Sequence, residues 1–236
     1  MALYRDQGIV LRTHKLGEAD RIISFITERH GKVRAVAKGV RKTKSKFGGR
    51  LEPTSHVALQ LYEGRELDIV TQAESIDHFK VIREDLDRLT KAVTMLEAVD
   101  QLSLEREPNP DLYRMLLGGL RTLAAKNSAL VVAGFHWKVL ALEGFRPMVD
   151  ACVVCNAADG LVAFDPTEGG LLCGEHRRGT RVSPEAVELL QQILGGRLAQ
   201  ALETEPSSAT HEVDNLANRV MEHHLERRLR SVGLLE

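Results

Sequence analysis

Short apolar runs separated by turn signals fill the first 80 residues, a pattern typical of β-strands. β-Branched and apolar residues dominate residues 20–27 and 31–38, and the Glu28-Arg29-His30-Gly31 segment between them suits a hairpin loop. Three further segments have the same character: 4–14, 56–64 and 66–74. Five short strands match the size and strand count of an OB-fold barrel, although another five-stranded barrel would give the same count.

From about residue 80 the apolar positions recur every three to four residues, which predicts helices. Two such series are separated by the breaker Glu107-Pro108-Asn109-Pro110, and they are Leu86, Leu89, Val93, Leu96, Val99 and then Leu112, Leu116, Leu120, Leu123. A third helix is expected from the Asn127-Ser128 cap to Glu143, and a fourth from Ser183-Pro184 to Gly195. A last amphipathic helix is expected to carry Val213, Leu216, Val220, Leu225 and Leu229.

Residues 150–180 show neither period, and they contain all three cysteines of the chain in the pattern C-x2-C-x17-C-x2-H. The four residues are Cys152, Cys155, Cys173 and His176. Each pair can hold one edge of a tetrahedral zinc ion from a tight turn, and Gly174 is expected to let the second turn close. The alternative is three unrelated buried cysteines and a surface histidine. If His176 is the fourth ligand, the shell is closed and one zinc ion is structural, since catalytic zinc keeps a position open.

These patterns predict an α+β multidomain chain: an N-terminal five-stranded OB-fold barrel followed by an α-helical domain with an inserted zinc-binding module. The expected boundaries are 1–79 for the nucleic-acid-binding barrel, 80–149 and 181–236 for the helical domain, and 150–180 for the zinc module. With 236 residues the chain can bury a core without disulfides, and three clustered cysteines favour a metal site in a reducing compartment. No signal-peptide core and no membrane-spanning apolar run occurs, so we expect a soluble cytoplasmic protein with no membrane partner.

Charge is distributed unevenly, although the formal net charge of the whole chain is only -1. Residues 1–50 hold 13 Lys and Arg against 4 Asp and Glu, whereas residues 51–236 hold 19 against 29. A split of this kind indicates a polyanionic partner for the N-terminal region more clearly than the overall charge could.

The excess is concentrated in KVRAVAKGVRKTKSKFGGR, residues 32–50, which has eight basic residues and no acidic one. Lys32, Arg34 and Lys38 share a parity in an expected strand and should project from one face. The rest resembles a flexible loop, and the complete set of candidate DNA-binding residues is Lys32, Arg34, Lys38, Arg41, Lys42, Lys44, Lys46, Phe47 and Arg50. A mobile cationic loop suits a sugar-phosphate backbone. The alternatives are a solvated surface loop, an acidic protein or membrane headgroups.

Phe47 and the arginines beside the cysteine motif each have two possible interpretations from the sequence. Phe47 could stack on a base or could plug the barrel and pin the loop. Arg177, Arg178 and Arg181, next to the cysteine motif, are expected to be a solvated face rather than a binding patch.

The motifs that would indicate an enzyme are absent from the sequence. There is no P-loop, dinucleotide fingerprint, G-x-S-x-G, H-E-x-x-H or deaminase signature, so we expect a protein without catalytic residues. A zinc-dependent nucleic-acid hydrolase, an OB-fold RNA-binding module and a pure protein adaptor are the competing interpretations.

The segment HKLGEADRIISFITERHGKVRAVAKGVRKTKSKFGGRLEP, residues 14–53, resembles the N-terminal signature of the bacterial RecO family of DNA repair proteins. The later helices, interrupted by a zinc-type segment, continue the resemblance over essentially the full length. It implies an OB-fold, a helical domain and an inserted zinc module, with the basic residues 34–50 in the DNA-binding region. Family members with this module commonly have a fourth cysteine where this chain has His176, and some lack the ligands.

The resemblance also implies a non-enzymatic role in recombinational repair in the cytoplasm, in association with the nucleoid. Such proteins bind single- and double-stranded DNA and anneal complementary strands. With RecR they promote the loading of RecA onto DNA covered by single-strand-binding protein, whose C-terminal tail is a further expected partner.

Overall fold

The computed structural model describes residues 2–231, and its contacts divide the chain between Ala125 and Lys126 into two compact units. The first unit joins the barrel to the first three helices, and the second contains the remaining helices and a small sheet. The three-part domain division expected from the sequence stays a prediction. The last residues of its helical part, 232–236, lie outside the described residues.

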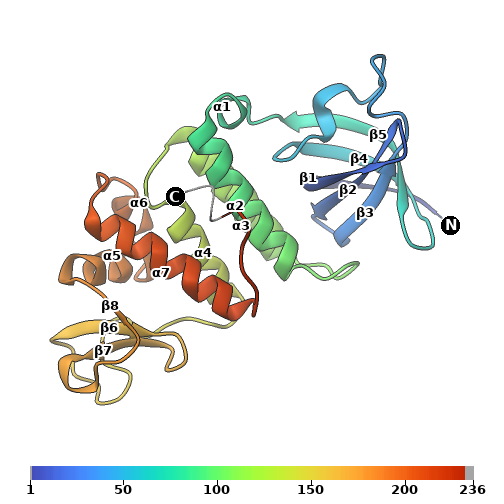
Figure 1. Cartoon of the computed structure of the whole chain (residues 1–236). Helices are drawn as coiled ribbons and strands as arrows, with labels where there is room; N and C mark the ends of the chain where they lie inside the picture. The colour runs from blue at the N-terminus through green and yellow to red at the C-terminus, as the bar shows by residue number, and fades with distance from the viewer. Residues whose placement is uncertain (1, 232–236) are drawn as a thin grey trace. The chain divides into compact units, whose positions relative to one another are not determined.

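A closed five-stranded barrel with the order β1-β2-β3-β5-β4 begins the first unit (Figure 1). Its strands are β1 (Leu3–Leu16), β2 (Asp20–Thr27), β3 (Gly31–Ala37), β4 (His56–Tyr62) and β5 (Asp68–Asp77). Neighbours pair antiparallel except β3 and β5, which pair parallel at two positions. The predicted five strands and the OB-fold barrel are therefore confirmed.

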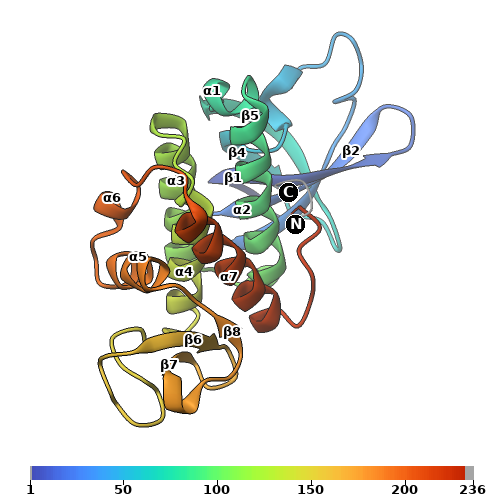
Figure 2. The same ribbon diagram turned by 60° about the vertical axis from the view of Figure 1, so that its left-hand side comes forward.

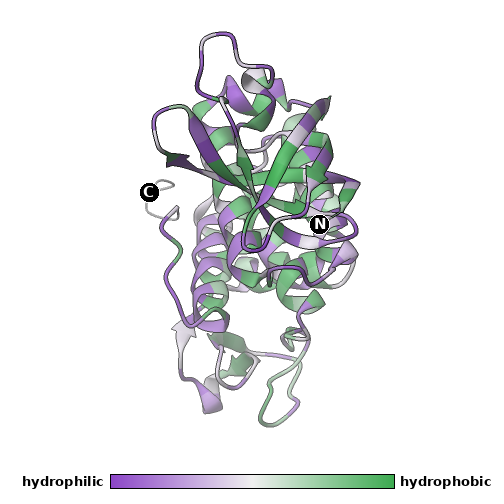
Figure 3. Cartoon of the chain, turned by 90° about the vertical axis from the view of Figure 1, so that its right-hand side faces the viewer, coloured by the Kyte–Doolittle hydropathy of each residue, from purple (hydrophilic) through white to green (hydrophobic). Residues whose placement is uncertain are grey.

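Alternating burial explains why these segments form a barrel. Along β3 every second residue is buried, and Val33, Ala35 and Ala37 enter the barrel core together with Ile23 and Phe25 of β2. Because successive side chains point to opposite faces, the residues between them face outward. In Figure 3 the barrel strands carry long hydrophobic stretches, consistent with a filled interior.

Three helices complete the first unit: α1 (Lys80–Arg83), α2 (Leu86–Leu102) and α3 (Pro110–Ala125). Asp85 caps α2 by accepting a hydrogen bond from the backbone N–H of Arg88, and α2 packs against β1 and β2. The segment between α2 and α3 runs close to the start of β3. A Cβ atom on Gly31, whose φ is +66°, would lie 1.9 Å from the carbonyl oxygen of Glu107, so only glycine fits there.

The second unit contains four helices among the described residues and a three-stranded sheet (Figure 2). The helices are α4 (Val131–Leu142), α5 (Pro184–Leu194), α6 (Leu198–Ala201) and α7 (Ser208–His224). The sheet has the order β7-β6-β8, from β6 (Leu161–Asp165), β7 (Gly170–Cys173) and β8 (Thr180–Arg181), and lies at one end of the helices in both views.

Residues 150–180, which show no period in the sequence, hold most of the three-stranded sheet, because strands of two to five residues are too short to show one. One expectation about this unit was wrong. The last helix ends at His224, so Leu225 and Leu229 lie beyond it; Glu226 has a φ of +51°, which the helix cannot accommodate. Within residues 2–231 no helix combines the length and the apolar character needed to cross a membrane.

Candidate metal centre and nucleic-acid interface

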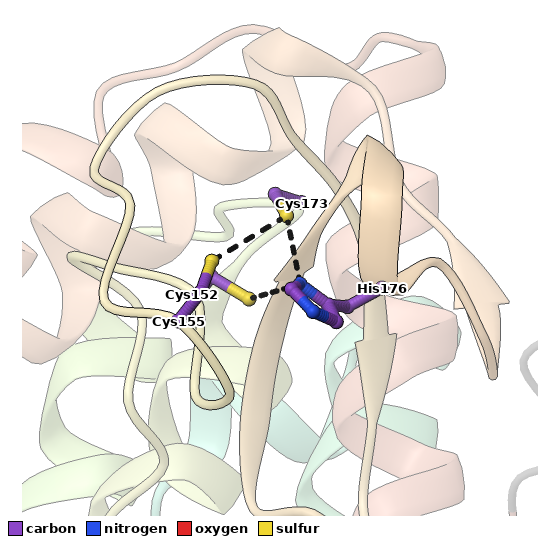
Figure 4. Close-up of side chains that lie close together, drawn as sticks. All are labelled: Cys152, Cys155, Cys173 and His176. Atoms are coloured by element: carbon purple, nitrogen blue, oxygen red, sulfur yellow. Dashed lines mark hydrogen bonds between the residues drawn. The ribbon is translucent and has the colours of Figure 1, made fainter.

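The four residues of the cysteine motif converge in the second unit (Figure 4). Their ligand atoms, three Sγ atoms and a ring nitrogen of His176, all lie within 4.8 Å of one another. The Sγ atoms of Cys155 and Cys173 are 3.8 Å apart, and Nδ1 of His176 lies 3.3 Å from Sγ of Cys173 and 3.9 Å from Sγ of Cys152. The structure therefore contradicts the alternative of unrelated cysteines.

Zinc geometry provides a direct test of fit. Zn–S bonds of about 2.3 Å and Zn–N bonds of about 2.0 Å at tetrahedral angles put two sulfurs about 3.8 Å apart and a sulfur and a nitrogen about 3.5 Å apart. The observed S···S separation of 3.8 Å equals the first value, and the S···N separations of 3.3 and 3.9 Å lie on either side of the second. The donor set thus could hold a metal ion and is compatible with zinc.

Two backbone turns present the ligands. After Cys152 the chain closes a turn in which the N–H of Asn156 donates to the Cys152 carbonyl, and Asn156 takes a φ of +60°. In the second pair, Cys173 is the last residue of β7 and His176 ends the short 3-10 helix η2 (Gly174–His176). The expected role of Gly174 was wrong, because its φ is not positive and a Cβ atom there would meet nothing within 4 Å.

Hydrogen bonds favour the deprotonated form, which a metal requires, at Cys152 and Cys173. At Cys155 the backbone N–H of Ala157 lowers the pKa, but desolvation and the hydrogen bonds with the other two thiols outweigh it and raise this pKa. Desolvation alone would raise the pKa of Cys152, but the backbone N–H groups of Cys173, Cys155 and Val154 outweigh it and lower this pKa to about 6. The hydrogen bond with His176, followed by backbone N–H groups, lowers the pKa of Cys173.

Of the arginines next to the cysteine motif, Arg178 forms ion pairs with Asp165 and Glu168, as expected for a solvated face.

The basic segment lies in the first unit and extends from β3 to the short helix η1 (Gly48–Leu51). Residues 38–46, hereafter the basic loop, project from the barrel and are mainly hydrophilic (Figures 1 and 3). Its five cationic side chains are all exposed: Lys38, Arg41, Lys42, Lys44 and Lys46. The structure gives Lys38, Lys42 and Lys44 no acidic partner within residues 2–231.

The basic loop is anchored more firmly than its sequence indicates. The N–H of Gly39 donates to the carboxylate of Asp20 at 2.7 Å, and the Arg41 guanidinium donates to the carbonyl of Glu18 at 3.0 Å. At the other end, Nζ of Lys46 donates to the carbonyl of Thr71 at 2.9 Å. Because carbonyls are neutral, Arg41 and Lys46 keep their positive charge while being held in place.

Phe47 and Arg50 fix the end of the basic loop. The Phe47 side chain is 1% exposed and belongs to the barrel core, so it is the plug and cannot stack on a base in this conformation. Arg50 donates to the carbonyls of Lys46 and Phe47 at 2.9 and 3.3 Å. The prediction of a base contact by Phe47 fails because burying its apolar ring in the core stabilises the fold.

The strand part of the basic segment differs from the expectation as well. Lys32 and Arg34 do project from one face of β3, but both have acidic partners near the α2–α3 segment. Nζ of Lys32 donates to the carbonyl of Asp100 at 2.6 Å and lies 3.4 Å from its carboxylate, with both side chains nearly buried. Arg34 pairs with Glu105 at 3.3 Å in a half-exposed pair. Lys38 lies just beyond the strand.

Lys32 is therefore not available to a phosphate in this conformation. Sequence could not show this, because Asp100 lies 68 positions away and reaches β3 only through the packing of α2 on the barrel. The anchors at Asp20 and Thr71 were missed for the same reason.

Comparison with known proteins gives matches over nearly the whole chain. Residues 1–79 match the family model described as recombination protein O N terminal, and residues 83–232 match the model described as recombination protein O C terminal. The chain is 44% identical over 245 residues to the "DNA repair protein RecO" of Nocardioides sp. (strain ATCC BAA-499 / JS614), covering 99% of each sequence.

Proposed function

This chain belongs to the RecO family of DNA repair and recombination proteins, and from this membership we propose that it is a non-enzymatic recombination mediator. It binds single- and double-stranded DNA, anneals complementary strands and, with RecR, promotes loading of RecA onto DNA covered by single-strand-binding protein. The tail of that protein is a further partner, and the cytoplasmic nucleoid is the expected place of action.

The observation that carries the DNA-binding proposal is the basic loop. Five exposed cations on nine residues, three of them without an acidic partner in the described chain, form a concentrated positive surface. Phosphate binding by such a surface releases counterions and needs charge rather than a fixed donor pattern. The proposed phosphate-binding residues are Lys38, Arg41, Lys42, Lys44, Lys46 and Arg50. Arg34 joins them when a phosphate replaces Glu105 as its partner. Lys32 and Phe47 are not included.

Annealing requires no bond chemistry. A protein that neutralises phosphates on two strands lowers their mutual repulsion and raises their local concentration, after which base pairing provides the free energy. This is why we assign no catalytic residue and prefer the mediator to a zinc-dependent hydrolase. Four protein ligands around one structural zinc ion would also leave no coordination position for an attacking water.

A strand-annealing assay tests the proposal. Complementary oligonucleotides, one carrying a fluorophore and one a quencher, are mixed bare or covered with single-strand-binding protein, with and without the chain. We expect faster annealing in both cases, and stronger acceleration at low than at high salt. No acceleration of bare strands would contradict the mediator role, and equal competition by RNA and DNA oligonucleotides would favour the RNA-binding alternative.

A further inference from the structure

One row of residues crosses the outer surface of the barrel from strand to strand. The register pairs Tyr62 of β4 with Ile69 of β5, Ile69 with Val36 of β3, and Val36 with Ile22 of β2. Residues directly opposite each other in paired strands point to the same side of a sheet. We call these four residues the outer row; it continues onto β1 at both ends, where Leu3 pairs with Tyr62 and His14 with Ile22.

The outer row faces away from the barrel core. The sequence neighbours of its members, Leu61, Val70, Ala35 and Ile23, all belong to the core cluster, so the row residues between or beside them point outward. Tyr62 is 39% exposed and Leu3 is 57% exposed, whereas Ile22, Val36 and Ile69 are half-buried. An outward sheet face normally carries polar residues, so an apolar row there indicates a contact surface.

The basic loop runs along one side of the outer row. Lys38 follows Val36 by two residues, a distance of about 7 Å along an extended chain. Lys46 is hydrogen-bonded to Thr71, which follows Ile69 by two residues on β5. Arg41 is hydrogen-bonded to Gly17 and Glu18 in the turn that joins β1 to β2, beyond Ile22. Positive charge therefore borders the apolar row across β5, β3 and β2.

Single-stranded DNA carries charged phosphates along its backbone and exposes the apolar faces of its unstacked bases. We therefore propose that the outer row is the base-binding surface of this barrel. Phosphates of single-stranded DNA lie along the basic loop, and unstacked bases lie on Tyr62, Ile69 and Val36, with Tyr62 as the stacking ring. A duplex keeps its bases inside and offers this row nothing but its backbone. This inference deepens the proposed DNA binding and rests on it.

The matched variants are Tyr62→Ala and Ile69→Thr, compared with Leu86→Ala, which removes another apolar side chain, 81% exposed, at the start of α2. Threonine keeps the β-branch that favours a strand. Binding is measured on three ligands of one length: a single strand, a duplex, and an abasic single strand that keeps every phosphate. Urea unfolding of each variant checks that the barrel is intact.

Base-aromatic stacking strengths predict that Tyr62→Ala weakens binding to the normal single strand by about 5-fold or more. Binding to the duplex and the abasic strand, and the salt slope on the normal strand, should stay as in the unsubstituted chain, and Leu86→Ala should change none of these. The unsubstituted chain should prefer the normal strand to the abasic one by a similar factor.

Equal affinity of the unsubstituted chain for normal and abasic strands would overturn the base-binding surface. So would unchanged single-strand binding by a stable Tyr62→Ala, which would assign the row to a protein partner instead. Failure of the proposed function looks different, since DNA binding itself, or its salt dependence, would then be absent on all three ligands.

Discussion

Lys32 on β3 has either a DNA-binding role, as its sequence position predicts, or a structural role. The variant Lys32→Ala distinguishes the two. Its Nζ donates to the Asp100 carbonyl at 2.6 Å and lies 3.4 Å from the Asp100 carboxylate. The side chains of Lys32 and Asp100 are 12% and 10% exposed. We therefore expect the substitution to reduce the stability of the first unit and to leave DNA binding little changed.

The magnitude follows from what the substitution leaves behind. Removing one partner of a buried ion pair costs about 3–5 kcal/mol, because the other charge stays buried and uncompensated. Here Nε of Arg12 remains 3.0 Å from the Asp100 carboxylate and keeps part of the compensation. We expect a loss of about 2–3 kcal/mol in the free energy of unfolding.

Urea unfolding followed by circular dichroism measures this loss as a lower midpoint at unchanged slope. Arg34→Ala on the same strand and face is the matched control. Its pair with Glu105 is 39% and 48% exposed, and exposed pairs contribute about 0–1 kcal/mol. The slope of log affinity for single-stranded DNA against log salt is measured for both variants.

The reasoning would be refuted if Lys32→Ala unfolded at the urea midpoint of the unsubstituted chain while its salt slope fell by about 0.7, the value for one lost phosphate contact on a single strand. Lys32 would then belong to the DNA-binding surface that the sequence predicts.

Two further predictions concern the second unit. We propose that the four-residue cluster holds one structural zinc ion. His176→Ala should then contain almost no zinc and be less stable, whereas the unsubstituted chain and His176→Cys should each contain one ion per chain. Atomic absorption and thermal unfolding check this, and full zinc in a stable His176→Ala would exclude His176 as a ligand. His136 is fully buried, and desolvation lowers its pKa to about 4 from 6.5. Between these pH values the unfolded state binds a proton that the folded state does not, so stability should fall by up to about 1.4 kcal/mol per unit as pH drops from 6.5 to 4. Urea unfolding should show this slope reduced in His136→Gln, and an identical slope in both proteins would contradict the assignment.

The sequence predicted the features that depend on local period and spacing. The barrel strands and most helices were found because alternation and three-to-four spacing are imposed by burial of one face. The four residues that could hold a metal ion were recognised because two short turns leave a characteristic spacing, and the structure brings them together, with Nδ1 of His176 3.3 Å from Sγ of Cys173.

Features that depend on long-range packing were not predictable. Asp100 neutralises Lys32, and Phe47 enters the core, only because distant segments meet in the folded first unit. The outer row could not be predicted from the sequence for the same reason, since Tyr62 and Val36 become neighbours of Ile69 only through strand register. The short strands β6 to β8 have too few residues to show a period.

The central claim is that the basic loop binds the DNA backbone through charge. The most direct measurement is the salt dependence of single-stranded DNA affinity for the unsubstituted chain and for the triple variant Lys38→Ala, Lys42→Ala, Lys44→Ala. These side chains are exposed and without acidic partners in the described part of the chain, so the fold should not change. At about 0.7 per contact, the account predicts that the steepness of the slope falls by about 2. The same affinity and the same slope in both proteins would contradict it.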